Sequence, residues 1–453
     1  MFEGKGCQKH PFFYFTKSTH HLKTKGSRDR YPFLYYPFNS QFMNNPQLDL
    51  DFVRSYFPAL KNGFVFMDNA GGSQTLKPVV DRISEYLLNY DVQHGASYEI
   101  SRLAGEKVDF ATKEMAKLVN AKDPKEIVMG HSSTMMFRLL SLTLSKAWKA
   151  GDEVITTNSE HESNCSPWMD LQEKGIVVKI WEVNPESLEF EIEDLKQLLS
   201  AKTKLVTMVH ASNILGTINP IAEVAKVVHE AGALFCVDGV ALAPHRLVDV
   251  QALDVDFYVF SCYKVYGPHC ALMYGKLEIL EAMAGINHYF ITEVPYKLQP
   301  GNKNFELTYS MAGLTEYLRS VHDHHYPNDA KADDQVKFQK SFDLFAAHEE
   351  ALANRFIDFL KTKDAVTILG VQNGDQKRRV STIAFHHDTL KSEAIVKQVD
   401  PHRIGIRFGD FYAKKLVQSL NLEAKGGPVR VSFVHYNTLE EVDRLIGVLE
   451  GVL

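Results

Sequence analysis

Short apolar runs alternate with a helical period along the middle of the chain. Leu205–Val209 is one apolar run, Ala222–Ala231 repeats apolar residues at helical spacing before Gly232, and Leu234–Val237 is a second run. A third run lies at Phe257–Phe260. Such runs are typical of strands that are buried on both faces. Strands separated by helices at this spacing predict an α/β protein with a mainly parallel sheet and right-handed crossovers.

Other segments extend this pattern. Glu126–Met129, before a helical stretch, and Glu153–Thr156, after it, predict two more strands of the same sheet. The polar stretch Val321–Asp334 is rich in His and Asp and predicts a solvated linker, with a metal site as the alternative. A long helical pattern follows, and strand-like pieces at Val380–Phe385 and Val429–Val434 then predict a smaller α+β domain.

The predicted organisation therefore has four parts. They are an extension at 1–42, a large domain at 43–320 whose first residues (43–60) can pack on the small domain, a linker at 321–335 and a small domain at 336–453. The extension is rich in Phe, Tyr and basic residues but has neither an amphipathic period nor the apolar core of a secretory signal. Two interpretations stay open: a disordered extension, with Met43 as an alternative start, or a targeting or docking segment.

Composition excludes several classes of protein. The 453 residues are 45% hydrophobic and 23% charged with a formal charge of -6, which is typical of a globular protein and gives no general attraction for nucleic acid. No apolar run approaches the roughly 18 residues of a membrane helix. The five cysteines are scattered without a CxxC pair, which favours a reducing, cytoplasmic location and no thiolate metal site.

Residues just after the predicted strands carry the candidate chemistry, because ligands of a parallel sheet bind beyond the carboxyl ends of its strands. Asp238 follows one run, and a buried carboxylate there requires a cationic partner such as a protonated ring nitrogen of a cofactor. Lys264 follows another run, among aromatic residues and before a Gly-Pro turn. Desolvation lowers the pKa of such an amine and favours Schiff-base formation. The structural alternatives are that Asp238 caps a helix or turn and that Lys264 lies on the surface.

Two further positions fit the same edge of the sheet. Ser132–Thr134 lies between a predicted strand and a helix, where backbone amides and hydroxyls suit a phosphate, although simple N-capping explains it equally well. His161 follows another strand and could stack on a flat ring or lie in a surface loop. With Asn213 after a further strand, the joint order of these residues is that of a pyridoxal phosphate (PLP) enzyme of the aspartate aminotransferase-like fold.

Longer motifs carry a family resemblance from about residue 50 to the C-terminus. They are Asp68–Ala70, Val209–Pro220, Val248–Leu253, Ser261–Lys264 followed by Gly267–His269, and Val429–Thr438. In these motifs the sequence resembles the class V aminotransferase and cysteine desulfurase family, and it is most similar to a cysteine desulfurase-like branch. The resemblance implies PLP as cofactor, the type I fold with a seven-stranded-type sheet in the large domain, and a homodimer with its sites at the interface.

The resemblance also implies a role for each site residue. Lys264 would hold PLP as a Schiff base, Asp238 would pair with the pyridine nitrogen, and His161 would stack on the ring. Asn213 would lie near the phenolic oxygen and Arg430 would bind the substrate carboxylate. Ser133, Thr134 and Ser261 would hold the phosphate, with Thr308 reaching the phosphate of a partner subunit, and Tyr263 would be a further cofactor-binding residue.

Departures from the family pattern bear on the reaction. Tyr412 stands where a desulfurase has its persulfide-forming cysteine, and no cysteine follows Cys270. Tyr263 replaces the usual His before the Lys, Ala241 replaces a Gln or His, and Asp410 lies in the altered loop. Cys262 and Cys270 are interpreted as apolar fillers rather than stand-in nucleophiles.

These departures predict an enzyme for a small or sulfur-containing amino acid that cleaves a Cβ–heteroatom bond without a persulfide cysteine. A class V aminotransferase or an epimerase is the alternative within the family. A non-catalytic scaffold that keeps the fold is the alternative from another class.

Overall fold

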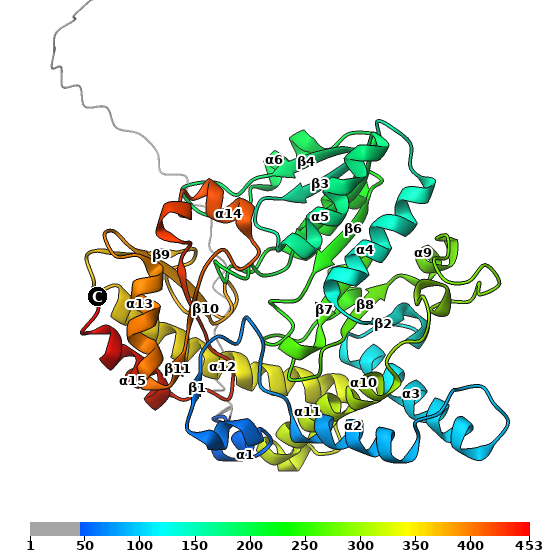
Figure 1. Ribbon diagram of the computed structural model, residues 1–453, viewed down its shortest axis with the longest axis horizontal. Helices are drawn as coiled ribbons and strands as arrows, with labels where there is room; N and C mark the ends of the chain where they lie inside the picture. Colours follow the sequence, from blue (N-terminus) through cyan, green and yellow to red (C-terminus); the bar gives the residue numbers. More distant parts are fainter. Residues whose placement is uncertain (1–45) are drawn as a thin grey trace, which may run out of the picture. The chain divides into compact units, whose positions relative to one another are not determined.

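A seven-stranded sheet forms the centre of the large lobe in the computed structural model, which describes residues 46–453. The predictions made for residues 1–42 and for Met43 lie outside the described residues. The strands lie in the order β2-β8-β7-β6-β5-β3-β4 (Figure 1). Their bounds are β2 Ile127–Gly130, β3 Glu153–Thr157, β4 Val177–Trp181, β5 Thr203–Val209, β6 Leu234–Asp238, β7 Phe257–Ser261 and β8 Ala271–Gly275. The pairs from β7 to β4 are parallel, whereas β8 is antiparallel to β7 and β2, so the predicted mainly parallel α/β fold is confirmed.

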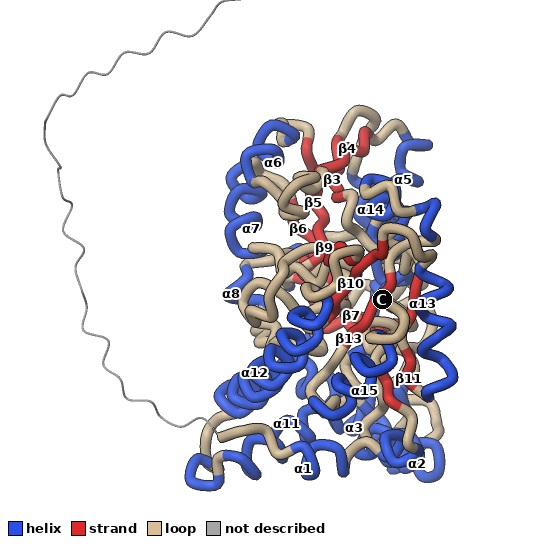
Figure 2. The backbone as a smooth tube through the Cα atoms, turned by 90° about the vertical axis from the view of Figure 1, so that its left-hand side faces the viewer, coloured by secondary structure: helices blue, strands red, loops and turns tan. Residues whose placement is uncertain are grey.

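Helices cover both faces of this sheet. Helices α6 (Ile192–Leu198), α7 (Ile221–Glu230) and α8 (Val250–Leu253) lie on one side and α5 (Ser166–Met169) on the other (Figure 2). Helix α4 (Ser133–Leu144) shares an apolar core with α5, which includes Phe137 and Trp168. The remaining helices of this lobe are α1 Leu50–Ser55, α2 Lys77–Asn89, α3 Glu99–Leu118, α9 Leu277–Ala282, α10 Phe305–Ser310 and α11 Ala312–His325. None of the helices described is long and apolar enough to cross a membrane.

Alternating strand residues enter two different apolar cores. Ile155 and Val206 belong to the core that includes α7, whereas their neighbours Val154 and Leu205 belong to the core that includes α4. Successive side chains of a strand point to opposite faces, so a strand covered on both sides must be apolar throughout. This requirement explains why the strands read as continuous apolar runs in the sequence.

The small lobe contains a separate antiparallel sheet in the order β12-β13-β10-β9. Its elements are β9 Val366–Leu369, β10 Thr382–His387, β11 Ile404–Gly405, β12 Arg407–Phe408, β13 Val429–Ser432, α13 Ser392–Val399, α14 Lys414–Ser419 and α15 Leu439–Leu449. β1 (Val65–Phe66), from the start of the described chain, pairs in parallel with β11. The strands predicted at 380–385 and 429–434 correspond to β10 and β13.

The stretch predicted as a linker is partly helical in the structure. α11 continues to His325 and α12 (Asp334–Leu360) begins directly after the N-cap residue Asp333, which leaves only residues 326–333 between the helices. His322 is fully buried, and its neighbour Asp323 pairs with Lys337 at 2.7 Å. This ion pair joins α11 to α12, so part of the His- and Asp-rich stretch belongs to two packed helices. Within residues 46–453, no group of three His, Cys, Asp or Glu side chains is placed to hold a metal ion.

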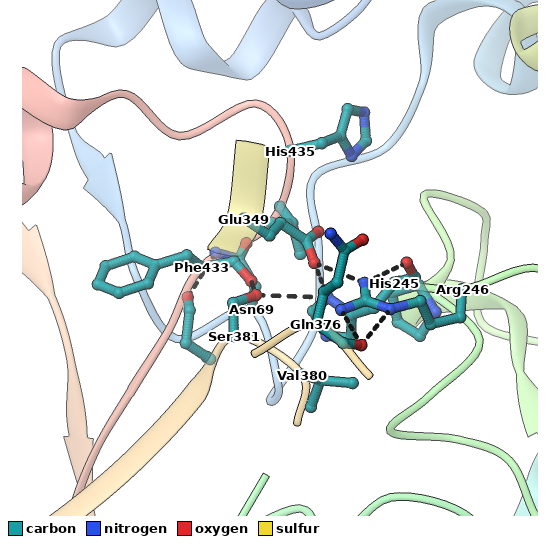
Figure 3. Close-up of polar contacts among 12 residues, drawn as sticks. Asn69, His245, Arg246, Glu349, Gln376, Val380, Ser381, Phe433 and His435 are labelled. Carbon is teal, nitrogen blue, oxygen red and sulfur yellow. Dashed lines mark hydrogen bonds and ion pairs between the residues drawn. The ribbon is translucent and has the colours of Figure 1, made fainter. Parts of the chain in front are cut away.

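Helix α12 connects the two lobes. Phe338 and Phe345 in its first half belong to the core of the large lobe, whereas Leu352 and Phe356 belong to the core of the small lobe. Near the middle of the helix, Glu349 is 1% exposed, and Figure 3 shows the polar cluster around it. Because α12 is continuous and passes from one core to the other, it marks no sharp boundary between the lobes. The domain boundaries predicted from the sequence therefore stay predictions.

The cluster of Figure 3 ties the loop after β6 to α12 and to the small lobe. The Glu349 carboxylate lies 2.9 Å from His245 Nδ1 and 3.4 Å from Arg246 Nη1. Arg246 also donates to the Gln376 carbonyl oxygen at 3.0 Å, and the Ser381 hydroxyl donates to the Phe433 carbonyl oxygen at 2.8 Å. A buried carboxylate therefore faces two basic side chains at the junction between the lobes.

Replacing Glu349 by alanine is expected to destabilise the protein by about 3–5 kcal/mol, because Arg246 then loses its buried anionic partner. Equilibrium unfolding of the apoprotein in urea measures this loss. The matched control is Glu106→Ala, which breaks an exposed pair with Arg102 and is expected to cost less than about 1 kcal/mol. Equal effects of the two substitutions would show that the buried cluster does not stabilise the fold.

Candidate active site

Asp238 is the last residue of β6 and is 2% exposed. Its Oδ1 accepts one hydrogen bond, from the Val240 N–H at 2.9 Å. Burial raises the pKa of this carboxyl to about 6, although the Val240 N–H and the nearby Lys264 ammonium oppose the rise. A buried carboxylate with one backbone donor is incompletely satisfied, so it is suited to pair with a cationic group of a ligand.

Lys264 ends the short 3-10 turn that follows β7, and its side chain lines the same pocket as Asp238. It is 7% exposed. Burial and the guanidinium of Arg430 lower the pKa of its ammonium to about 8, while Asp238 and Asp68 act in the opposite direction. The turn leaves little room for a side chain at Gly267, where a Cβ would lie 3.0 Å from the Cys262 carbonyl oxygen and 2.7 Å from Met311 Sδ. The lowered pKa and the burial describe a desolvated amine, which is suited to act as a nucleophile.

Hydroxyl groups gather at the N-terminus of α4. Ser132 caps the helix, and the Ser261 hydroxyl at the end of β7 donates to Ser133 Oγ at 2.9 Å. The Thr134 and Ser163 hydroxyls are 2.7 Å apart. All five residues line the pocket. Free helix N–H groups surrounded by hydroxyls suit an anion such as a phosphate group.

His161 and Asn213 line the pocket from the ends of β3 and β5. His161 Nδ1 accepts the Ser163 N–H at 3.1 Å, and burial, together with the charges of Lys264 and Arg430, lowers the pKa of the ring to about 4. The imidazole is therefore neutral at pH 7 and able to stack on a flat ring. Asn213 Nδ2 donates to the Phe411 carbonyl oxygen at 2.9 Å, but its buried Oδ1 has no partner among the described residues.

Arg430 lies in β13 at the junction with the small lobe and is 2% exposed. Its Nη2 is 2.7 Å from Asp68 Oδ1, its Nη1 donates to the Asn213 carbonyl oxygen at 3.1 Å, and its guanidinium lies 3.9 Å from the Phe411 ring centroid. The buried Nε–H has no partner within residues 46–453. An unused donor on a fixed guanidinium suits it to bind a carboxylate.

Of three other residues singled out in the sequence, two line the pocket and one does not. Tyr263 and Ala241 line the pocket, and the Tyr263 ring stacks on His269 with centroids 4.9 Å apart. Thr308 is not brought to this pocket. It is 2% exposed within the single chain, and its hydroxyl donates at 2.7 Å to the carbonyl oxygen of Asn304, the N-cap residue of α10. Its predicted contact with a partner's phosphate stays a prediction.

Sequence reasoning missed Glu160, which lies behind the pocket. Its carboxylate accepts from Thr157 Oγ1 and Asn164 Nδ2 at 2.6 Å and from the Val209 N–H at 2.8 Å. Burial raises its pKa to about 8. These bonds join the ends of β3 and β5 and fix the residue before His161. A charged residue three positions after the end of β3 was the available signal.

Comparison with known proteins identifies the class of this fold and site. The family model for class V aminotransferases matches residues 65–445. An aminotransferase-like protein, FGM3, of Gibberella zeae is 41% identical over 91% of this chain and 100% of its own length. The cysteine desulfurase-like protein ustD of Aspergillus flavus is 34% identical over 90% of this chain and 91% of its own. The apo structure of a cysteine desulfurase from Thermococcus onnurineus superposes with a TM-score of 0.78 at 26% identity, covering 90% of this chain and 98% of the other.

The large sheet with its pocket at the strand ends is that of a PLP-dependent enzyme of fold type I. The chain belongs to the class V aminotransferase family, and PLP is its cofactor. The residues present fit this group. The pocket offers a desolvated amine, a buried carboxylate for the ring nitrogen, a neutral imidazole, an unpartnered amide oxygen and hydroxyls at a helix N-terminus.

The lowered pKa of Lys264 predicts the pH dependence of cofactor attachment. Because only the neutral amine attacks an aldehyde, the initial rate at which the apoprotein takes up PLP is expected to rise about tenfold per pH unit and to level off above pH 8. The rate is followed by visible absorption between pH 6 and pH 10. Nα-acetyl-lysine is the control, since its amine keeps the ordinary pKa near 10.4 and its rate continues to rise. A rate of the apoprotein that still climbs above pH 9.5 would contradict the prediction.

Proposed function

We propose that the enzyme is a lyase that cleaves a Cβ–heteroatom bond, above all a carbon–sulfur bond, of a small or sulfur-containing amino acid, without a persulfide cysteine. The observation that carries this proposal is the loop Gly409–Ala413, which presents Tyr412 beside His161, with ring centroids 5.3 Å apart. A phenol cannot accept sulfur as a thiolate does. β-Elimination needs no such acceptor, so it is compatible with this loop.

The cysteines of the described chain support the proposal. Cys165, Cys236, Cys262 and Cys270 are all buried. Burial raises the pKa of Cys165 to about 12 and that of Cys236 well above its ordinary value. A hydrogen bond with Cys270, together with burial, does the same for Cys262. Thiols held in the protonated state are poor nucleophiles, so none of these three is suited to take sulfur from a substrate.

The proposed roles follow the positions of the side chains. Lys264 would attach PLP, Asp238 would pair with its ring nitrogen, and His161 would stack on its ring. Asn213 would lie near its phenolic oxygen. Ser133, Thr134 and Ser261 would hold its phosphate together with the N-terminus of α4, and Tyr263 would be a further cofactor-binding residue. When bound, PLP supplies an electron sink for the substrate carbons.

The protein's own groups then perform the proton transfers and the orientation of the substrate. Arg430 holds the α-carboxylate through donors that include its free Nε–H, which fixes the orientation of Cα. The Lys264 amine, once released, removes the Cα proton because its pKa of about 8 is close to neutral pH. Loss of the leaving group from Cβ completes the elimination.

An absorption titration with product analysis tests this function. The PLP-loaded enzyme is mixed with L-cysteine, L-cysteine sulfinate and a panel of other amino acids, and sulfide, sulfite and pyruvate are assayed without added thiol. A spectral change with release of pyruvate and the sulfur product supports the lyase. A spectral change without release would identify an aminotransferase or epimerase instead. If the protein cannot be loaded with PLP, the enzyme functions are excluded and a non-catalytic scaffold is the remaining function.

We also propose that the enzyme is a homodimer, as the resemblance implies. Apolar side chains on the loop after α9 support this state, since Tyr289 is 95% and Phe290 68% exposed in the single chain. Light scattering coupled to gel filtration tests it. A mass near 51 kDa, that of one chain, would contradict it.

A further inference from the structure

The loop Gly409–Ala413 is held against the pocket by its backbone. Phe411 and Tyr412 both have left-handed conformations, with φ of 50° and 59°. The carbonyl oxygen of Phe411 accepts from Asn213 Nδ2 at 2.9 Å, and that of Tyr412 accepts from the Glu162 N–H at 2.7 Å. A left-handed conformation is unfavourable for an aromatic residue and persists only where surrounding contacts impose it. The loop is therefore fixed to Asn213, which lines the pocket, and to Glu162, which directly follows His161.

The two aromatic side chains of this loop have different surroundings. Phe411 is 7% exposed and packs beneath the Arg430 guanidinium. Tyr412 is 65% exposed, and its ring lies beside that of His161. The Tyr412 hydroxyl forms no hydrogen bond with any residue between 46 and 453, whereas its backbone N–H is held by Asp410 Oδ1 at 3.0 Å. A positioned backbone thus carries the Tyr412 phenol beside His161, which lines the pocket.

We propose that the Tyr412 hydroxyl donates the proton that the departing heteroatom requires. This inference rests on the lyase function proposed above. The Cα–H bond breaks with its proton going to Lys264 Nζ, and its electron pair forms the Cα–Cβ double bond. The Cβ–S bond breaks with its electron pair on sulfur, which takes the proton of Tyr412 and leaves as a neutral thiol or hydrogen sulfide. The phenolate regains a proton from water.

The neighbouring groups are less suited to this step. Lys264 is occupied with the Cα proton. His161 is the ring that stacks on the cofactor, and its Nδ1 already accepts the Ser163 N–H. Asp410 Oδ1 is engaged by the Tyr412 backbone, and the four described cysteines are buried. Tyr412, in contrast, carries a hydroxyl that forms no hydrogen bond with any described residue, and its ring lies beside His161.

The experiment compares two leaving groups in the Tyr412→Phe variant, which keeps the ring against His161 and removes only the hydroxyl. Thiolate is a poor leaving group that benefits from protonation, whereas chloride leaves without a proton. Pyruvate formation from L-cysteine is expected to fall about 100-fold in the variant, while that from β-chloro-L-alanine stays within about twofold. Tyr326→Phe, which alters a partly exposed tyrosine in the turn between α11 and α12, is the control and should change neither rate.

A second readout does not depend on turnover. Tetranitromethane nitrates accessible phenols, and peptide mass spectrometry measures the nitration of Tyr412. The reaction is run with and without L-alanine, an amino acid that fills the site but has no leaving group. Nitration of Tyr412 is expected to be lost when L-alanine is bound. The Tyr412→Phe variant should also retain the visible absorption of bound PLP.

The outcomes separate the two proposals. An equal loss of activity toward both compounds, or nitration that L-alanine leaves unchanged, would overturn the role of Tyr412 and leave the lyase standing. If the unaltered enzyme forms no pyruvate from either compound, the lyase function falls, and the role of Tyr412 falls with it.

Discussion

Replacing Lys264 by alanine is expected to abolish covalent attachment of PLP and to reduce turnover by about 10⁴-fold or more. The side chain provides both the nucleophile that attaches the cofactor and the base that removes the Cα proton, and no second lysine among residues 46–453 lines the pocket. The spectrum of bound PLP and the rate of pyruvate formation from L-cysteine are the two measurements.

The control is Lys226→Ala, on an exposed position of α7, which should alter neither quantity. Exogenous methylamine, a small amine that can enter the vacated space, is expected to restore part of the proton transfer in Lys264→Ala. Turnover that survives the substitution without added amine would remove Lys264 from the reaction. An unchanged cellular phenotype of the variant would favour the scaffold.

The central sheet could be predicted because each strand is buried on both faces. The run Leu205–Val209 falls within β5, and Leu234–Val237 is followed at once by Asp238, the end of β6. A polar residue at the end of an apolar strand marks the edge where ligands bind, so Asp238 and Lys264 could be selected before the structure was known. The structure brings both into one pocket.

Features that depend on distant contacts could not be predicted. β1 pairs with β11 across more than 300 residues of sequence, and no local pattern encodes that register. The polar stretch 321–333 has the composition of a linker, yet Val321 and His322 are fully buried in α11 because α12 packs against it. The left-handed conformation of Phe411 and Tyr412 is likewise imposed by Asn213 and Glu162, which are remote in sequence.

Arg430→Lys is expected to weaken recognition of the substrate carboxylate. Losing one partner of a buried, hydrogen-bonded charge pair costs about 2–5 kcal/mol, which corresponds to a factor of about 30 to 5,000 in affinity. Lysine retains the charge but cannot place donors on both sides of a carboxylate. The concentration of L-cysteine that half-saturates the spectral change of bound PLP is therefore expected to rise by at least about 30-fold.

Cysteamine, which is cysteine without the carboxylate, separates this role from a structural one. The unaltered enzyme is expected to prefer L-cysteine strongly, and Arg430→Lys should reduce this preference because the affinity for cysteamine does not depend on the guanidinium. Arg378→Lys, at an exposed arginine paired with Glu189, is the matched control. If the ratio of the two affinities is the same in Arg430→Lys and in the unaltered enzyme, Arg430 stabilises the junction of the lobes through Asp68 and does not bind the substrate.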